Sequence, residues 1–296
     1  MAHQVRIVDV FTDKALAGNQ LAVVLDGRAI SDELMQRIAR EMNFSETTFV
    51  LPPDDPEHAA KLRIFTPARE LPFAGHPTIG TAWVLRDEGL VPNGATEFVL
   101  EEGVGPVGVR IDKETVWMTH PRVVFSDVFE NRAAVAAALD LPEAALAPRI
   151  PIQIASTGVP FLYVALRTKA DVDAALSDAE RLGSLFEGRH EVAVFLFAVA
   201  GRNELYSRMF AGPLFDIRED PATGSASGPL GAFAVRYGLV DTAPTVTIRS
   251  EQGAKMGRQS FIHIELTYRD SAEIPDRIEV GGSVVPVLKG TLSDFS

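Results

Sequence analysis

Short segments in which apolar and polar residues alternate occupy much of the chain. Turn-forming residues separate each of these segments from the next. A period of two is typical of strands that bury one face and expose the other to water. We therefore expect a sheet-rich protein, whose clearest candidate strands are 105–111 (GPVGVRI), 115–120 (TVWMTH), 243–250 (APTVTIRS) and 260–268 (SFIHIELTY).

Two other segments have helical rather than alternating patterns. In the segment 31–42 (SDELMQRIAREM) apolar residues recur on one helical face, and Ser31 is suited to cap the first turn. The segment 171–186 (DVDAALSDAERLGSLF) carries Asp171 near its start. Both segments are predicted to be helices.

An internal repeat relates the two halves of the chain. The segment 75–91 (GHPTIGTAWVLRDEGLV) resembles 224–240 (GSASGPLGAFAVRYGLV), which lies 149 residues later. Each begins with Gly and ends in Gly-Leu-Val. Gly89 and Gly238 stand where a left-handed residue ends a helix. Each segment is therefore predicted to be a helix that starts and stops at glycine.

The repeat extends towards the N-terminus of each half. The tripeptide RIF (63–65) precedes the first of these helices, and RMF (208–210) precedes the second. Earlier still, GNQLAVVL (18–25) corresponds to GVPFLYVAL (158–166), a Gly turn followed by an apolar run. The same order of matches in both halves predicts two similar α/β domains that arose by duplication.

A chain of 296 residues is long enough for two domains of ordinary size. We expect an N-terminal lobe over residues 1–120 and a C-terminal lobe over residues 121–277. The final segment, 278–296, is expected to return to the first lobe.

Composition excludes several classes of function. The chain has no cysteine, which rules out disulfides, thiolate metal sites and cysteine nucleophiles. It contains no uncharged apolar run of the ~18 residues that a membrane span needs, and no signal peptide, so the expectation is a cytoplasmic protein. The net charge of −12, with Lys and Arg scattered singly, argues against nucleic acid or an anionic membrane as a partner and indicates a well-solvated surface.

The two glycine-led helix starts are candidate anion sites. A helix start carries unpaired N–H groups and a partial positive charge, and Gly75 and Gly224 would let a ligand approach the backbone closely. Pro77 fits the first helical position. For either start alone, glycine as a simple helix boundary is the better interpretation. Their pairing favours a small carboxylate ligand held between two domains that face each other.

The glycines do not fit a nucleotide-binding loop. No Lys-Ser/Thr follows them, as a Walker loop requires, and no G-x-G-x-x-G motif follows a strand. The segment GSASG is not a nucleophile elbow either, because Ala226 holds the central position.

Three titratable residues lie close to these features. Glu46 stands in an otherwise uncharged strand-like run, either at a strand end in water or in a cleft, where burial would raise the pKa of its carboxyl group and suit it to general acid–base catalysis. His76 lies at the first helix start, and Asp220 lies shortly before the second. Taken singly, His76 is more simply a helix cap and Asp220 a turn residue. The six histidines show no metal-ligand spacing, so no metal site is predicted.

On these residues the chain resembles the phenazine-biosynthesis PhzF-like family, which belongs to the diaminopimelate epimerase fold class. The resemblance covers almost the whole chain and is carried by VDVFTDKALAGNQLAVV (8–24), NFSETTFV (43–50), FTPARELPFAGHPTIGTAWVL (65–85) and DPATGSASGPLGAFAVRYGLV (220–240).

The resemblance implies an α+β fold of two pseudo-symmetric lobes, each a mixed, mostly antiparallel sheet curled around a central helix. The central helices would be 76–88 and 225–237, with the active site in the cleft between the lobes. It also implies an enzyme, a cofactor-independent isomerase acting on a small carboxylate-bearing molecule, and the family is often dimeric. The best-understood member isomerises a dihydro-hydroxyanthranilic acid.

The same resemblance implies roles for individual residues. Glu46 would move a proton from one substrate carbon to another, as base and then acid, with His76 and Asp220 assisting. The remaining positions would bind the substrate, with backbone N–H groups at both helix starts holding its carboxylate: Asn19, Ser45, Gly75, Gly224, Ser225 and Ala226.

The amino-acid epimerases of this fold class use two cysteines, and Ala74 and Ala222 stand at those positions here. Racemisation by two thiols is therefore impossible for this chain. Two alternatives to the isomerase stay open. One is a small-molecule binding protein without catalysis, and the other is a cysteine-free racemase or epimerase in which Asp220 supplies the second acid.

Overall fold

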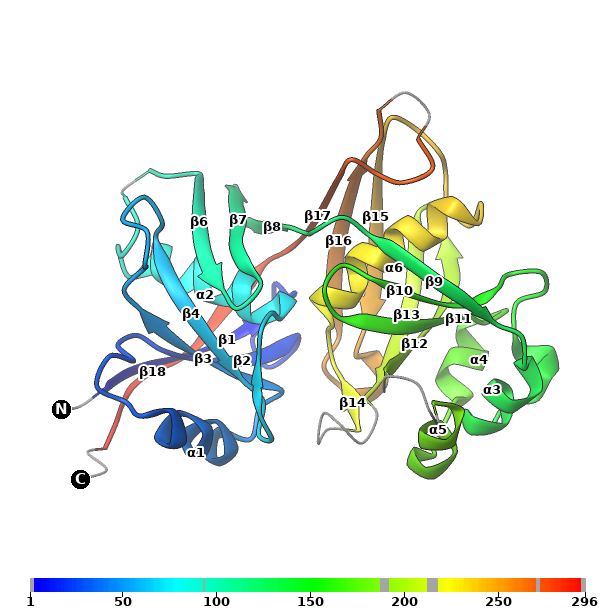
Figure 1. Ribbon diagram of the computed structural model, residues 1–296, viewed down its shortest axis with the longest axis horizontal. Coiled ribbons are helices and arrows are strands. Elements are labelled where there is room, and N and C mark those ends of the chain that lie inside the picture. The colour runs from blue at the N-terminus through cyan, green and yellow to red at the C-terminus, as the bar shows by residue number, and fades with distance from the viewer. Residues whose placement is uncertain (1–2, 93, 187–191, 212–217, 270–271, 294–296) are drawn as a thin grey trace. The chain divides into compact units, whose positions relative to one another are not determined.

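The computed structural model describes residues 3–92, 94–186, 192–211, 218–269 and 272–293, coloured along the chain in Figure 1. It divides into two compact units. Unit 1 comprises Met1–Thr119 and Val280–Ser296, and unit 2 comprises His120–Glu279.

Unit 1 is a mixed sheet with two helices. Its strands are β1 (His3–Val10), β2 (Asn19–Val24), β3 (Glu46–Leu51), β4 (Ala60–Phe65), β5 (Glu70–Leu71), β6 (Glu97–Glu102), β7 (Gly105–Asp112), β8 (Thr115–Thr119) and β18 (Val284–Leu292), and its helices are α1 (Asp32–Met42) and α2 (Gly75–Asp87). The strand order is β18–β1–β2–β3–β4–β6–β7–β8, with short β5 also on β4. The pairs β2–β3 and β4–β6 are parallel, and the others are antiparallel.

Unit 2 repeats this arrangement and adds short helices. Its strands are β9 (Val124–Phe129), β10 (Ile152–Ser156), β11 (Pro160–Ala165), β12 (Ala193–Gly201), β13 (Glu204–Phe210), β14 (Glu219–Asp220), β15 (Thr245–Gln252) and β16 (Ser260–Thr267), with β17 (Arg277–Gly282) crossing the unit boundary. Its helices are α3 (Arg132–Ala138), α4 (Lys169–Ala174), α5 (Ala179–Leu185) and α6 (Gly224–Arg236), with 3₁₀ turns at Glu143–Ala145 and Ala254–Met256.

The two sheets have the same topology. In unit 2 the order is β9–β10–β11–β12–β13–β15–β16, and its parallel pairs, β11–β12 and β13–β15, fall at the places of β2–β3 and β4–β6 in unit 1. Short β14 lies on β13 as β5 lies on β4. The predicted fold of two pseudo-symmetric lobes, each curled around one helix, is therefore confirmed.

Helices α2 and α6 are the central helices of the two units, and both are buried on nearly every side (Figure 1). Small residues allow this close packing. A Cβ atom on Gly80 of α2 would stand 2.6 Å from Leu21 Cδ2 and 2.8 Å from Val10 Cγ2. A helix that lies inside a core has no face in contact with water. The sequences of α2 and α6 therefore lack amphipathic spacing.

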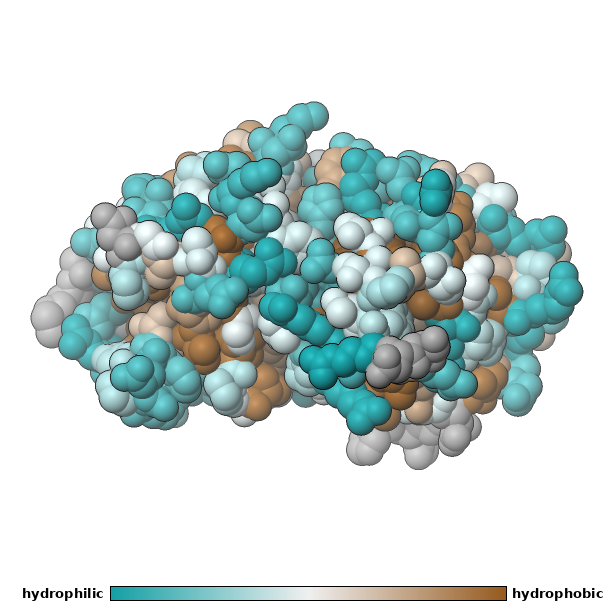
Figure 2. Space-filling view, turned by 90° about the horizontal axis from the view of Figure 1, so that it is seen from above, coloured by the Kyte–Doolittle hydropathy of each residue, from teal (hydrophilic) through white to brown (hydrophobic). Residues whose placement is uncertain are grey.

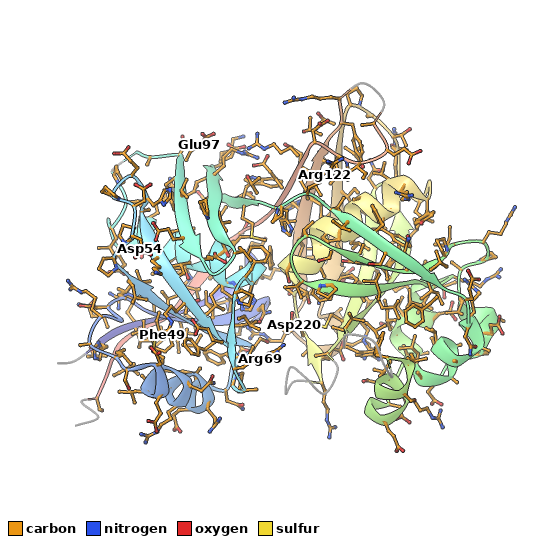
Figure 3. The ribbon with its side chains drawn as sticks, in the orientation of Figure 1. Phe49, Asp54, Arg69, Glu97, Arg122 and Asp220 are labelled. Atoms are coloured by element: carbon orange, nitrogen blue, oxygen red, sulfur yellow. The ribbon has the colours of Figure 1, made fainter. Side chains whose placement is uncertain are left out.

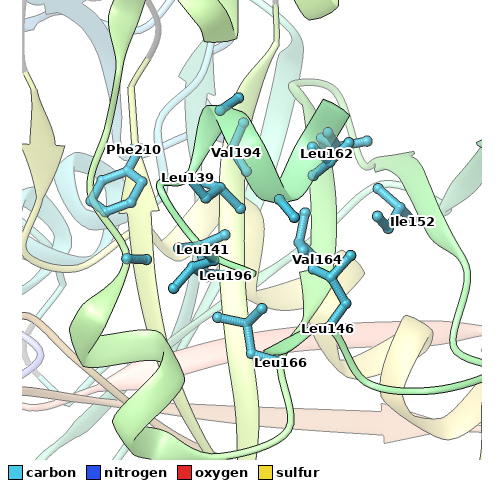
Figure 4. Close-up of a cluster of buried hydrophobic side chains, with 14 of the residues drawn as sticks. Leu139, Leu141, Leu146, Ile152, Leu162, Val164, Leu166, Val194, Leu196 and Phe210 are labelled. Carbon is cyan, nitrogen blue, oxygen red and sulfur yellow. The ribbon is translucent and has the colours of Figure 1, made fainter. Parts of the chain in front are cut away.

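The sheet of each unit also packs on its other face. In unit 1, α1 covers Ala22 and Val24 of β2, together with the edge-to-face pair Phe49 and Phe65, whose ring centroids are 5.5 Å apart. In unit 2, α3, α4 and α5 cover a cluster that Figure 4 shows on β11 and β12. Because alternate residues of a strand face opposite sides, strands covered on both faces are apolar throughout.

The helix boundaries differ in part from those predicted. Ser31 caps α1 as expected, and Gly89 and Gly238 have φ of +67° and +65°. The central helices begin at Gly75 and Gly224, one residue before the predicted starts. Pro77 is therefore the third helical residue rather than the first, where its missing N–H still removes no helical bond.

The prediction of one helix over 171–186 is wrong. Helix α4 ends at Ala174, and α5 begins at Ala179 behind Asp178, whose side chain accepts from the Arg181 N–H. The buried guanidinium of Arg208, on β13, donates from Nη1 to the carbonyl groups of Val172 and Ala175 at 3.0 and 2.8 Å. A strand distant in sequence thus binds the carbonyl groups that end α4.

On the face of the molecule shown in Figure 2, hydrophilic residues are interspersed with apolar areas, in keeping with the net charge of −12. Among the described residues, no helix is long and apolar enough to cross a membrane.

We predict that Gly80→Ala destabilises the protein by about 1–3 kcal/mol, because the new methyl group overpacks the contact of α2 with β1 and β2. Gly183→Ala is the matched control, since Gly183 lies in α5 with nothing within 4 Å of its added Cβ. It should stabilise by about 0.5–1 kcal/mol through helix propensity. Denaturant unfolding measures both changes, and equal effects of the two substitutions would contradict the close packing of α2.

Candidate active site

A tight turn places the first candidate residue, Asn19, at the start of β2. The preceding Gly18 has φ of +67°, and a Cβ atom there would lie 2.3 Å from the Val10 carbonyl oxygen, so only glycine fits this turn. Asn19 itself is buried. The parallel pairing of β2 with β3 sets Leu21 opposite Glu46, so Asn19 and Glu46 both stand at the beginning of adjacent strands.

One ring nitrogen of His76, Nδ1, lies close to the side chains of both Asn19 and Glu46. Asn19 Nδ2 lies 3.2 Å from His76 Nδ1, and Glu46 Oε2 lies 3.4 Å from the same nitrogen. His76 is 3% exposed and the Glu46 side chain is 15% exposed. The structure therefore joins three of the residues predicted from sequence, all of them in unit 1, into one cluster.

Burial keeps His76 neutral. Desolvation lowers the pKa of His76 to about 3, against a smaller raising effect of a hydrogen bond to the Gln20 backbone. A neutral imidazole carries its proton on either Nδ1 or Nε2, and Nδ1 is the nitrogen that faces both Asn19 and Glu46. An ionised Glu46 can accept from Nδ1 when the ring proton is there, whereas a protonated Glu46 can donate to Nδ1 in the other tautomer. The neutral ring can thus pair with Glu46 in either protonation state.

The start of α2 adjoins this cluster without a side-chain cap. Its N-cap, Ala74, has no polar side chain, and the first-turn residues Gly75 and His76 carry N–H groups that no helical carbonyl can reach. These groups and the helix dipole favour an anion. Ser45 immediately precedes β3 and is half-buried.

In unit 2 the corresponding polar residues surround Asp220, which Figure 3 labels on β14. Asp220 is 5% exposed, and Thr223 Oγ1 donates to its Oδ2 at 2.6 Å. Gln252 Nε2 donates to the Asp220 carbonyl oxygen and to Thr223 Oγ1, both at 2.9 Å. Thr223 is the N-cap of α6, so these bonds connect Asp220 to the helix start.

An arginine fixes the strand that carries Asp220. Arg208 donates from Nε and Nη2 to the two carboxylate oxygens of Glu219 at 2.8 and 2.9 Å. In unit 1, Arg63 holds Glu70 of β5 in the same two-bond geometry at 2.7 Å. The two pairs occupy equivalent positions, because Phe65 and Phe210, in the repeated tripeptides, stand opposite Glu70 and Glu219.

The three predicted binding residues of α6 differ in what they can donate. Gly224 and Ser225 are its first two residues and are buried. The Ala226 N–H donates to the Thr223 carbonyl at 3.2 Å, and the Ala226 carbonyl accepts from Tyr163 Oη at 2.7 Å. The backbone of Ala226 is thus engaged within unit 2, which leaves the first two N–H groups as the ones suited to a ligand.

Sequence reasoning missed two residues of this network, Thr223 and Gln252. Thr223 had a local signal, because threonine directly before a glycine-led helix is a typical N-cap. Gln252 had none, since it is the last residue of a strand that begins after α6.

These groups suit proton transfer. A carboxylate beside a neutral imidazole can take up and return a proton, and uncapped helix starts stabilise negative charge. Among the described residues, no cluster of three or more His, Cys, Asp or Glu side chains could hold a metal ion.

Comparison with known proteins gives consistent matches over nearly the whole chain. A family profile described as "Phenazine biosynthesis-like protein" matches residues 8–290. The chain is 36% identical to a trans-2,3-dihydro-3-hydroxyanthranilate isomerase from Pseudomonas chlororaphis, covering 98% of this chain and 99% of that one. A crystal structure of a Bacillus anthracis phenazine biosynthesis protein of the PhzF family aligns with a TM-score of 0.90 and 25% identity, covering 99% and 100% of the two chains. A probable proline racemase from Agrobacterium radiobacter shares the fold, with a TM-score of 0.66, 15% identity, and coverage of 98% and 93%.

We predict that His76 stays neutral at pH 5 in an NMR titration of the histidine ring signals, because its pKa lies near 3. The signal is assigned by its loss in His76→Asn. Since the folded pKa is below the unfolded one, this group stabilises the fold above pH ~6.5 and progressively less as pH falls. A midpoint near the ordinary value of about 6.5 would contradict the buried cluster.

Proposed function

The chain belongs to the phenazine biosynthesis-like protein family of isomerases, and we propose that it moves a proton within a small carboxylate-bearing substrate without a cofactor. The observation that carries this proposal is the contact of Glu46 with the neutral ring of His76 beside the uncapped start of α2. A base, a hydrogen-bond acceptor for its protonated form and an anion-binding helix start are what such a reaction needs.

The proposed reaction has two proton transfers. Glu46 first removes a proton from a substrate carbon: the C–H bond breaks, an O–H bond forms on Glu46, and the electron pair passes into an enolate-like system. Glu46 then delivers a proton, which exchanges with solvent while it resides on the carboxyl group, to a different carbon of that system, which yields an isomer and the original carboxylate. Between the steps, with the ring proton on Nε2, His76 Nδ1 accepts a hydrogen bond from protonated Glu46 in place of one from Asn19.

The substrate carboxylate is proposed to bind at the helix starts. The N–H groups of Gly75 and His76 would hold it in unit 1, where Asn19 and Ser45 line the approach. The proposal also assigns Asp220 and the N–H groups of Gly224 and Ser225 to the same substrate, and the equivalence of the two helix starts in the repeated fold supports this. The substrate named for the Pseudomonas relative is a ring acid of this class and is the first candidate to test.

An epimerase is the second candidate. The fold shared with the probable proline racemase and the buried carboxyl group of Asp220 favour it, because epimerisation needs acids on two faces of one carbon. A binding protein without chemistry is the third. The homodimer expected from the resemblance stays a prediction.

We predict that Glu46→Gln lowers turnover of trans-2,3-dihydro-3-hydroxyanthranilate by roughly 10²–10⁴-fold, because the amide cannot accept a proton. Glu41→Gln, the same change on the exposed end of α1, is the control and should leave turnover unchanged. Incorporation of deuterium from D₂O, followed by NMR, measures proton transfer directly. If Glu46→Gln exchanged deuterium at the wild-type rate, the assignment of Glu46 as the base would be wrong. If the wild-type protein bound the compound saturably without exchange, a binding protein without catalysis would be favoured.

Asp220→Asn separates the isomerase from the epimerase. In the isomerase it should slow turnover moderately, by about 10²-fold, without changing which isomer forms, since Asp220 only assists. In a two-acid epimerase it should abolish inversion while Glu46 still exchanges its proton with solvent. Chiral analysis of the product, together with the deuterium content of each carbon, distinguishes these results.

A further inference from the structure

The proposed reaction makes no use of Glu102, a buried carboxyl group behind the start of α2. Glu102 is the last residue of β6 and is 8% exposed. Its Oε1 lies 2.6 Å from Thr78 Oγ1, and Thr78 Oγ1 lies 2.8 Å from the carbonyl oxygen of Ala74, the N-cap of α2. The three groups form a chain from the strand end to the helix start.

The two oxygen–oxygen contacts need two hydrogens, and this requirement favours a proton on Glu102. A threonine hydroxyl has a single proton, and the Ala74 carbonyl can only accept. If Glu102 were ionised, two acceptors would compete for the Thr78 proton, and one of these short oxygen–oxygen contacts would contain no hydrogen. Both contacts are satisfied when Glu102 Oε1 carries a proton and donates to Thr78, which donates to Ala74.

The surroundings of Glu102 also favour the neutral acid. Burial raises the pKa of Glu102 to about 8, against the lowering effects of Thr78 and the Ala74 N–H, and no charged side chain contributes. On α2 the nearby imidazole of His76 is itself neutral. Three ion pairs engage charged groups of β4, β5, β6 and the loop before β4: Lys61 with Asp54, Arg63 with Glu70, and Glu101 with His58.

Unit 2 contains an amide at the equivalent position. Gln252 is the last residue of β15, the counterpart of β6. Its Oε1 accepts from the N–H of Thr223, the N-cap of α6, at 3.1 Å, and its Nε2 donates to Thr223 Oγ1 at 2.9 Å. An amide offers one donor and one acceptor group, as a carboxylic acid does and a carboxylate does not. Protonated Glu102 thus reproduces in unit 1 what Gln252 does in unit 2.

We propose that Glu102 is a positioning residue that works as a carboxylic acid, holding the N-cap of α2 so that the N–H groups of Gly75 and His76 stay directed at a substrate carboxylate. Ionisation of Glu102 removes the donor and introduces an uncompensated negative charge behind the anion site. Substrate binding therefore weakens at alkaline pH. Only the statement about substrate rests on the proposed function.

The first test measures protonation through stability and requires no substrate. A folded pKa above the unfolded one means that the folded protein binds the proton more tightly, so wild-type stability falls as pH rises from about 5 to about 8. Glu102→Gln keeps a donor and an acceptor but cannot ionise. The denaturant midpoint of Glu102→Gln should therefore rise relative to that of wild type as pH increases from about 5 to about 8. Above this range the difference between the two midpoints should stay constant.

Glu97→Gln is the matched control, the same substitution at the exposed beginning of β6, and its difference from wild type should not change over this pH range. In wild-type protein labelled with ¹³C at glutamate Cδ, the signal that Glu102→Gln removes should titrate near pH 8. A constant stability difference together with titration of that signal near the ordinary value of about 4.3 would overturn the proposal.

The second test measures binding of trans-2,3-dihydro-3-hydroxyanthranilate in the Glu46→Gln background, where turnover is blocked. Its Kd should rise about tenfold per pH unit above the pKa of Glu102, as for loss of one required proton. The rise should disappear in Glu46→Gln/Glu102→Gln and persist in Glu46→Gln/Glu97→Gln.

The outcomes separate the two proposals. If Kd depends on pH in the same way in Glu46→Gln and in Glu46→Gln/Glu102→Gln, the proposed role of Glu102 at the anion site is overturned, even if Glu46 proves to be the base. If no variant binds the compound, the proposed substrate is wrong, and the stability and NMR titrations still decide whether Glu102 is protonated.

Discussion

The central constraint on this protein is that each unit begins its central helix inside its own core. The first N–H groups of a helix lack helical acceptors, and leaving them unpaired away from water is costly. Neither α2 nor α6 has a side chain at the N-cap that closes its first turn. The polar residues brought to these points therefore meet two requirements in our proposal, since they satisfy part of the helix start and leave the rest for the proposed anionic ligand.

The duplicated scaffold shows which contacts belong to the fold and which to the site. The two-bond pairs Arg63–Glu70 and Arg208–Glu219 are present in both units, as are the two parallel strand pairs. The groups at the helix starts differ, with Glu46 and His76 in unit 1 and Asp220 and Ser225 in unit 2. Ion pairs that occur in both units stabilise the shared fold, while the polar residues at the two helix starts differ in their chemistry.

Burial favours neutral groups around the proposed base. It lowers the pKa of His76 and raises that of Glu102, so both are uncharged near pH 7. A neutral imidazole can accept from a protonated Glu46, and a neutral acid behind α2 does not oppose the attraction of the helix start for an anion. The low-dielectric interior thus supports both the proton transfer and the carboxylate binding that we propose.

The sequence by itself determined the repeat, the alternating strands, the glycine-bounded central helices and the family, because strand period, helix period and the left-handed turns of Gly89 and Gly238 are local properties. It also supplied Glu46, His76 and Asn19 as candidates. Only the tertiary structure decided that they meet at one nitrogen, since the parallel register of β2 and β3 brings together residues far apart in the chain. The same holds where Arg208 ends α4 and where burial by distant strands raises the pKa of Glu102: these effects arise from neighbours that no local pattern encodes.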